Sequence, residues 1–305
     1  MIEIDQLTKR YGDKTAVQDL SFSVRPGQVT GFLGPNGAGK STTMRMIVGL
    51  DRPTRGRATV DGRSYVAHTA PLQKVGALLE AQSVHRGRTA RNHLIALAQT
   101  HGIPAGRVDE TLESVGLGDA ARRRVGAFSL GMGQRLGIAA ALVGDPEVII
   151  LDEPVNGLDP DGVLWIRNLL KDLAGQGRTV LVSSHLMSEM AVTAEHLVII
   201  GRGRLLADTT VEELIARVDT DTVTVRSPQA GELRDLLVGD GATVSSTERG
   251  VLQVHGVAVE RISALAADRG IALHELTPKR ASLEEAYMDL TRDALEYRTD
   301  DRSAA

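Results

Sequence analysis

An α/β fold is predicted by two short apolar segments that each run into residues suited to chemistry. Val29–Leu33 leads directly into a glycine-rich stretch, which is followed by residues with helical spacing. Val148–Leu151 is uniformly apolar and ends at Asp152 and Glu153. Uniformly apolar strands that alternate with helices are typical of a largely parallel sheet covered on both faces. We therefore expect a mixed sheet core whose polar strand ends gather at one edge.

The glycine-rich stretch matches the pattern G-x-x-x-x-G-K-[ST] in the strand-to-helix setting that this pattern requires. Its residues are Gly34, Pro35, Asn36, Gly37, Ala38, Gly39, Lys40, Ser41 and Thr42. The glycines let successive backbone N–H groups turn toward a polyphosphate, and the next helix directs its positive end at the same anion. Lys40 can contact the β- and γ-phosphates, and the Ser41 hydroxyl can bind Mg²⁺. A plain strand-to-helix turn is the alternative, but the flanking pattern favours an ATP or GTP site.

The composition narrows the class of protein. The 305 residues include 35 Lys and Arg against 39 Asp and Glu, and the net charge of −4 argues against a general nucleic-acid binder. The chain has no cysteine, which excludes disulfides and thiol chemistry. No apolar run reaches the roughly 18 residues of a membrane span, and the first residues do not resemble a signal peptide. We expect a soluble protein that reaches a membrane only through a partner.

An antiparallel β-subdomain is expected ahead of the glycine-rich loop. Met1–Leu7 alternates apolar and polar residues, and Ala16–Val24 is rich in apolar residues before a Pro-Gly turn. Tyr11 lies between these segments and is one of four tyrosines in the chain. An aromatic residue at this place can stack on a nucleotide base. The alternative is a tyrosine that simply packs at a turn.

A helical subdomain is expected at about residues 83–145, between the loop and the second apolar strand. A short buried strand at 74–80 precedes it, and helical spacing follows at 89–101 and 108–115. Three consecutive arginines at 122–124 fit a solvated surface and receive no further role.

Two polar strand ends are candidates for catalysis. Asp152 and Glu153 follow a buried strand, so they are expected at the sheet edge where ligands bind in open α/β folds. Asp152 suits Mg²⁺, directly or through water, and Glu153 can polarise a water that attacks the γ-phosphate. The strand expected at 179–183 leads to His185, whose position favours a γ-phosphate sensor over an ordinary structural histidine.

A small α+β domain is expected at residues 218–291. Its segments follow the order β-α-β-β-α-β, with the last strand at 271–276, and this order suggests a ferredoxin-like domain. Because no acidic, histidine or glycine cluster there suggests chemistry, we expect a regulatory or docking module. Residues 292–305 are charged and lack periodicity, so they are expected to form a flexible tail.

Taken together, residues 1–217 resemble the ATP-binding cassettes of ABC transporters. In this resemblance Gly34–Thr42 is the Walker A loop, and Val148–Asp152 is Walker B with Glu153 as the catalytic carboxylate. The other matching positions are Tyr11 for the adenine-stacking aromatic, Ser129 and Gly131 for the signature motif, Asp159 for the D-loop, His185 for the switch histidine and Glu80 for the Q-loop ligand of Mg²⁺. The resemblance therefore implies an α/β P-loop NTPase of the ABC type that hydrolyses ATP.

Several positions depart from the commoner family pattern. Leu130 and Met132 stand where the signature motif usually has Gly and Gln, and Asn156 replaces the usual D-loop serine. Glu80 stands in place of the Q-loop glutamine, with Gln82 two residues later as the other candidate. This combination is similar to the daunorubicin- and bacitracin-resistance branch of exporters, and the last domain resembles the C-terminal extension of that branch.

The resemblance also implies partners. Two copies would form a head-to-tail dimer, in which ATP on the Walker A side of one chain is covered by the signature motif of the other. The dimer would drive a separately encoded multi-span permease from the cytoplasmic face of the membrane. The resemblance implies that the cargo is a drug, an antibiotic or a lipid for export.

Two other functions remain open at this point. A non-transport ABC ATPase acting on the ribosome or DNA is disfavoured by the single Walker A motif, the absence of long heptad repeats and the acidic net charge. A nucleotide-binding protein without hydrolysis is disfavoured by the presence of Lys40, Asp152, Glu153 and His185.

Overall fold

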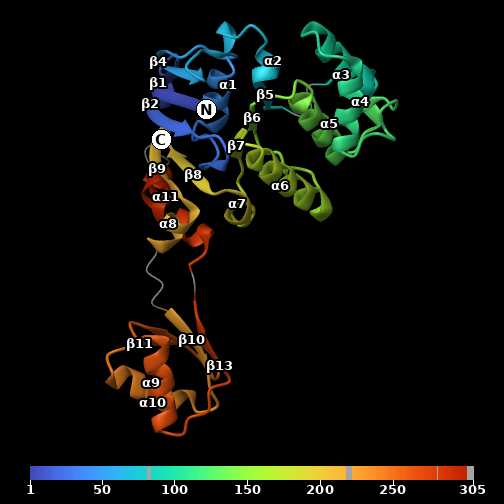
Figure 1. Cartoon of the computed structure of the whole chain (residues 1–305). Helices are drawn as coiled ribbons and strands as arrows, with labels where there is room; N and C mark the ends of the chain where they lie inside the picture. Colours follow the sequence, from blue (N-terminus) through green and yellow to red (C-terminus); the bar gives the residue numbers. More distant parts are fainter. Residues whose placement is uncertain (81–83, 218–221, 280, 301–305) are drawn as a thin grey trace. The chain divides into compact units, whose positions relative to one another are not determined.

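The structure is a computed structural model that describes residues 1–80, 84–217, 222–279 and 281–300 (Figure 1). It divides into two compact units, one made of Met1–Val211 with the chain's end from Leu290, and the other of Glu212–Asp289. The sequence predicts a division after residue 217, because the last matching motifs end there. Packing divides the chain a few residues earlier.

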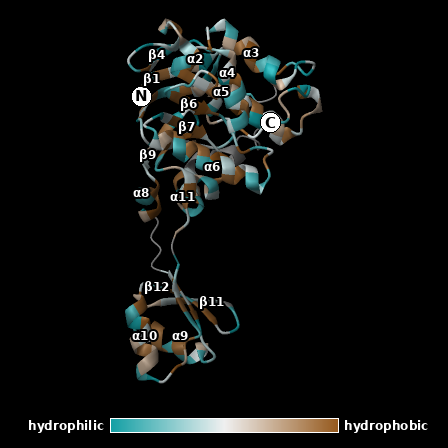
Figure 2. Ribbon diagram, turned by 45° about the vertical axis from the view of Figure 1, so that its right-hand side comes forward, coloured by the Kyte–Doolittle hydropathy of each residue, from teal (hydrophilic) through white to brown (hydrophobic). Residues whose placement is uncertain are grey.

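A six-stranded mixed sheet forms the centre of the first unit (Figure 1). In spatial order its strands are β5 (Val75–Leu78), β6 (Val148–Leu151), β7 (Thr179–Ser183), β3 (Val29–Leu33), β8 (His196–Gly201) and β9 (Arg204–Thr210). All neighbours are parallel except β8 and β9, which form a hairpin. The strands β3, β6 and β7 are buried along their whole length, as their largely apolar sequences predict. Figure 2 shows these hydrophobic residues in the middle of the unit.

A second, antiparallel sheet packs against the first. It consists of β1 (Ile2–Tyr11), β2 (Lys14–Val24) and β4 (Arg55–Val60), in the order β2-β1-β4. Buried and exposed residues broadly alternate in β2 because only one face of this sheet is covered. The rings of Phe22 and Phe32 meet between the sheets with centroids 5.4 Å apart. One continuous hydrophobic core therefore joins the two sheets.

Helices cover the sheets and form the expected helical subdomain. The helix α1 (Lys40–Ile47) contributes Met44 and Ile47 to the core shared by the sheets, and α6 (Pro160–Gly175) packs on β7 and β3. The other helices described up to residue 216 are α2 (Pro71–Lys74), α3 (Ala90–Thr100), α4 (Ala105–Ser114), α5 (Leu130–Leu142), α7 (Met187–Thr193) and α8 (Val211–Ala216), with 3₁₀ turns at Tyr65–Ala67 and Val125–Ala127. The helices α3, α4 and α5 pack on one another and account for the segment predicted to be helical.

The second unit contains a four-stranded antiparallel sheet in the order β11-β12-β10-β13. Along the chain its elements are β10 (Thr222–Arg226), α9 (Ala230–Gly239), β11 (Thr243–Glu248), β12 (Val251–His255), α10 (Val259–Asp268) and β13 (Glu275–Pro278). The β-α-β-β-α-β order is that of a ferredoxin-like fold. The last strand was expected at 271–276 but begins at Glu275. Ile271 and Leu273 pack into the hydrophobic core from the loop, so their apolar character reflects burial and not strand pairing.

The chain's last described element is α11 (Leu283–Asp300). The flexible tail expected from residue 292 stays a prediction; the backbone is helical as far as Asp300. Helical residues without an apolar stripe give no periodic signal, so the sequence pattern did not reveal them. Residues 301–305 of the predicted tail lie outside the described residues.

Among the described helices, none is both long and apolar enough to cross a membrane.

The close contact between β5 and α5 gives a test of the fold. A Cβ built on Gly76 would overlap the carbonyl oxygen of Ala141, whereas one built on the exposed Gly175 meets nothing within 4 Å. We expect Gly76→Ala to lower the free energy of unfolding by about 1–3 kcal/mol, because α5 must move to admit the methyl group. Gly175→Ala is the matched control and should leave stability unchanged or slightly raised. Urea denaturation measures both, and equal stability of the two variants would contradict this packing.

Candidate functional site

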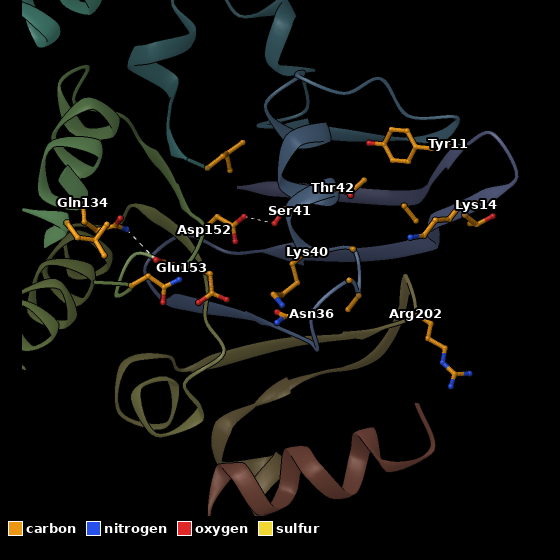
Figure 3. A pocket seen from close by; sticks show the side chains of 18 residues that line it. Tyr11, Lys14, Asn36, Lys40, Ser41, Thr42, Gln134, Asp152, Glu153 and Arg202 are labelled. Atoms are coloured by element: carbon orange, nitrogen blue, oxygen red, sulfur yellow. Dashed lines mark hydrogen bonds between the residues drawn. The ribbon is translucent and has the colours of Figure 1, made fainter. Parts of the chain in front are cut away.

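A cavity of about 720 Å³ opens at the carboxyl edge of the six-stranded sheet (Figure 3). Its lining comes from the β1–β2 turn, the glycine-rich loop, the start of α1, the ends of β5 and β6, the start of α5 and the β8–β9 turn. The lining residues are Tyr11, Lys14, Thr15, Ala16, Asn36, Gly37, Ala38, Gly39, Lys40, Ser41, Thr42, Leu79, Leu130, Gln134, Asp152, Glu153, Asn156 and Arg202. The structure thus brings most of the predicted Walker A and Walker B residues into one site.

The glycine-rich loop is held closely by neighbouring backbone. A Cβ on Gly34 would overlap the carbonyl oxygen of Ile200, and one on Gly39 would lie 2.7 Å from the carbonyl oxygen of Ala16. Gly39 also has a φ of 108°, which favours glycine, and it directly precedes the first turn of α1. These positions therefore require glycine to form an anion-binding loop at a helix N-terminus.

Lys40 extends from the first residue of α1 back across this loop. Its side chain is buried, and Nζ donates hydrogen bonds to the carbonyl oxygens of Gly34, at 2.6 Å, and Pro35, at 3.4 Å. Burial lowers the pKa of Lys40, and the carboxylates of Glu153 and Asp152 oppose that shift. The ammonium group is therefore held where a bound phosphate group would supply an opposite charge next to it.

Ser41 and Asp152 meet between α1 and the end of β6. The Ser41 hydroxyl donates to Oδ2 of Asp152 at 2.6 Å, as the dashed line in Figure 3 shows. A hydroxyl and a carboxylate are oxygen ligands of the kind that Mg²⁺ prefers, with phosphate oxygens and water completing its shell. Across the described residues, no group of three or more acidic, histidine or cysteine side chains could hold a metal by itself. The donors present therefore fit a metal that is bound together with a nucleotide.

Glu80, the first Q-loop candidate, does not line the cavity beside this pair. Leu79 lines the cavity, while Glu80 is exposed and is not among the described lining residues. Gln82, the other candidate, lies outside the described residues. The expected contact of Glu80 with Mg²⁺ stays a prediction.

Glu153 and His185, each predicted to take part in catalysis, lie next to each other. Oε2 of Glu153 lies 2.7 Å from Nδ1 of His185. The peptide N–H of Glu153 donates to Oγ of Ser183 at 2.9 Å, and its carbonyl accepts a 3.3 Å hydrogen bond from the side chain of Gln134. Glu153 is therefore held at its backbone as well as at its side chain.

Ser183 is a residue that the sequence reasoning missed. It was predicted only as the last residue of a buried strand, although its hydroxyl also donates to Oδ1 of Asp152. The available signal was a polar serine at the end of an apolar strand. That strand, β7, neighbours β6, which Asp152 follows.

The signature and D-loop residues occupy helix starts beside the cavity. Ser129 caps α5 by accepting a hydrogen bond from the N–H of Met132, and Asp159 caps α6 in the same way from Gly162. Ser129, Gly131 and Asp159 are absent from the described cavity lining, to which α5 contributes Leu130 and Gln134 instead.

Leu130 also connects the signature motif to the D-loop of the same chain. A Cβ built on Gly157 would overlap the Leu130 side chain, and Gly157 has a φ of 77°. The departure from glycine at position 130 is thus accommodated by a glycine at position 157.

Tyr11 lies at the far end of the cavity from the acidic residues (Figure 3). Its hydroxyl donates to Oδ2 of Asp51 at 3.0 Å, and Arg45 donates to the same oxygen at 2.8 Å. Burial and the hydrogen bond to Asp51 raise the pKa of Tyr11, while the Arg45 hydrogen bond lowers the pKa of Asp51. Lys9 lies over the Tyr11 ring, 4.8 Å from its centroid. The ring is therefore fixed in orientation but 48% exposed, as a stacking surface requires.

Two cations at this end were also missed. Lys14 is the first residue of β2 and Arg202 lies in the β8–β9 turn, and both line the cavity with Tyr11. Turn residues carry no periodic signal that would assign them to a site. For Arg202, the glycines on either side indicated only a hairpin turn.

Comparisons with known proteins agree with the site. A family model described as ABC transporter matches residues 17–156, and a second, described as a domain of unknown function (DUF8746), matches residues 221–284. The chain is 35% identical over 304 residues to the bacitracin transport ATP-binding protein BcrA of Bacillus licheniformis, covering 95% of this chain and 97% of that one. It is also 35% identical over 306 residues to the daunorubicin resistance ATP-binding protein DrrA3 of Streptomyces coeruleorubidus, covering 96% of each.

Solved structures share the fold of the first unit. A structure described as the ATP-binding subunit of an ABC transporter has a TM-score of 0.65 at 26% identity and covers 71% of this chain and 92% of its own. The dimeric structure of MJ0796, a bacterial ABC transporter cassette, has a TM-score of 0.63 at 25% identity and covers 69% and 98%. The predicted α/β P-loop fold of the ABC type is confirmed. The site, the fold and the relatives together show that this chain belongs to the ABC transporter family, as an ATP-binding subunit with ATPase activity.

Proposed function

We propose that the chain powers the export of a drug, an antibiotic or a similar amphipathic compound by hydrolysing ATP at the cavity that begins with the glycine-rich loop. The observation that carries the proposal is the convergence of Lys40, Ser41, Asp152, Glu153 and His185 at one sheet edge. Relatives named for bacitracin transport and daunorubicin resistance support this class of cargo. As a transporter ATP-binding subunit it would act at the cytoplasmic face of the membrane, bound to a separate permease.

In the proposed reaction, Glu153 orients a water for attack on the γ-phosphorus of ATP and accepts its proton. The bond from the γ-phosphorus to the bridging oxygen breaks, which releases ADP and phosphate. Lys40 would stabilise the charge on the transferring group, and His185 would hold the Glu153 carboxylate toward the γ-phosphate. Bound at Ser41 and Asp152, Mg²⁺ would neutralise charge on the β- and γ-phosphates.

A head-to-tail dimer would complete the site. Ser129 and Gly131 begin α5 but do not line the described cavity of their own chain, so their N–H groups and the helix N-terminus remain available for another chain's nucleotide. ATP would then favour the closed dimer, and loss of the γ-phosphate would remove that preference. The dimeric cassette structure of MJ0796 supports a dimer for this fold.

The role of Glu153 gives a direct test. Glu153→Gln should keep ATP binding and lower kcat by roughly 10²–10⁴, because a positioned base is lost while the shape of the site remains. Glu147 immediately precedes the same strand β6 and pairs with Lys74 outside the cavity. Glu147→Gln is therefore the matched control and should hydrolyse ATP at the normal rate. Normal turnover of Glu153→Gln in a steady-state ATPase assay would refute the proposed role.

If Tyr11 stacks on the adenine base, the affinity of the cavity for ATP should depend on the base. Tyr11→Ala should weaken ATP binding by about 1–3 kcal/mol, the usual value of stacking one base on an aromatic ring. Its effect on inorganic tripolyphosphate should be negligible, and Asp51→Asn should produce a smaller loss with the same selectivity. Competition binding measures both ligands. Equal losses for the two would indicate damage to the fold, and no loss for either would exclude stacking.

Mixing two inactive variants tests the head-to-tail arrangement. Lys40→Ala removes the Walker A contact, and Ser129→Asp keeps a helix-capping residue while placing a negative charge toward the phosphate. Each should be inactive alone. A mixed head-to-tail dimer regains one intact site, so an equimolar mixture should recover up to about a quarter of the wild-type rate if the sites act independently. No recovery at any protein concentration would count against the arrangement.

A further inference from the structure

We propose that Ser183 is the positioning residue that orients both carboxylates of the hydrolysis site through one hydroxyl group. The inference rests on the proposed function and adds a residue outside its motifs. Ser183 ends β7, and its neighbours Val182 and Leu151 face each other across the β6–β7 pair. This register brings Ser183 beside the two residues that follow β6.

The hydrogen-bond roles of Ser183 are fixed by its partners. Its Oγ accepts the backbone N–H of Glu153 at 2.9 Å and lies 2.5 Å from Oδ1 of Asp152. A serine hydroxyl has a single proton, and the peptide N–H can only donate. The proton of Ser183 must therefore point at the Asp152 carboxylate. Because Ser183 has no exposed surface, water does not compete for either bond.

For Asp152, the consequence is that its two carboxylate oxygens accept hydrogen bonds from different donors. Oδ1 accepts from Ser183 within the sheet, and Oδ2 accepts from Ser41 on the cavity side. Two donors on different oxygens set the plane of the carboxylate. Losing the Ser183 bond would free the group to rotate away from the position at which it and Ser41 can share a metal.

For Glu153, the consequence concerns the backbone. Glu153 has a φ of 50°, a conformation that residues with a Cβ seldom adopt. Ser183 holds its N–H while Gln134 holds its C=O, so both polar groups of this residue are tied to neighbouring elements. The conformation directs the carboxylate to His185. A strained backbone conformation that is maintained by hydrogen bonds to the surrounding structure is typical of functional sites.

A buried hydroxyl in the same sheet provides the control. Thr30 lies on β3, the other neighbour of β7, and has no exposed surface. Its Oγ1 has no hydrogen-bond partner within the described parts of the chain. Thr30→Val thus removes a buried hydroxyl without touching Asp152 or Glu153.

The experiment compares Ser183→Ala with Thr30→Val in two measurements. We expect Ser183→Ala to lower kcat by about 10- to 100-fold, the usual effect of losing a residue that orients a metal ligand. In a Glu153→Gln background, which separates binding from turnover, Ser183→Ala should also raise the Mg²⁺ concentration needed for half-maximal binding of a fluorescent ATP analogue by about 10-fold. Thr30→Val should change neither value. Ser183→Thr, which keeps the hydroxyl, should restore most of both.

Several outcomes would overturn the inference. Unchanged kcat and Mg²⁺ dependence in Ser183→Ala would do so, as would equal losses in Thr30→Val, which would show a general packing effect. If thermal denaturation shows that Ser183→Ala does not fold, Ser183→Cys replaces it, because a thiol of similar shape donates only weakly. Failure of the proposed function is distinguishable, since Glu153→Gln alone would then retain normal turnover.

Discussion

The alignment of three parallel strand ends is the constraint on which the rest of the molecule depends. The strands β6, β7 and β3 are adjacent, and their hydrogen-bonded register brings their carboxyl ends to one edge. A slip of one residue would turn every side chain to the opposite face. Because these strands are buried and largely apolar, a slip would draw the polar residues that follow them into the core, which is costly. Packing in the sheet thereby sets the positions of the polar side chains that follow these strands.

That constraint explains which parts of the site the sequence predicts well. The glycine-rich loop and Lys40 lie in one continuous strand-loop-helix segment, so their spacing fixes their geometry. Asp152 and Glu153 are placed with similar certainty because they follow a four-residue apolar strand. The fold class follows from the same features, and the relatives bear out the family. The placement of these residues could be predicted because it is set by neighbours along the chain.

The contacts that escaped prediction join segments far apart in sequence. Ser183 is 31 residues from Asp152, and Asp51 is 40 residues from Tyr11. Nothing in either local pattern indicates the partner, since the pairing arises only when strands and helices pack. The last strand was predicted to begin at residue 271 but begins at Glu275. The apolar loop residues before it are buried in the core, and their pattern resembles that of a strand. The helical backbone from residue 292 to residue 300 escaped for a different reason, because those residues carry no apolar stripe.

The contact between Leu130 and Gly157 has a consequence for recombination between relatives. Gly157 is constrained twice, by its backbone angle and by the leucine side chain that fills the space beside it. A signature segment with leucine at position 130 is compatible only with a D-loop of the same chain that leaves the space beside Gly157 empty. Chimaeras that exchange one segment without the other would therefore be expected to assemble poorly, and the two segments should be inherited as a single module.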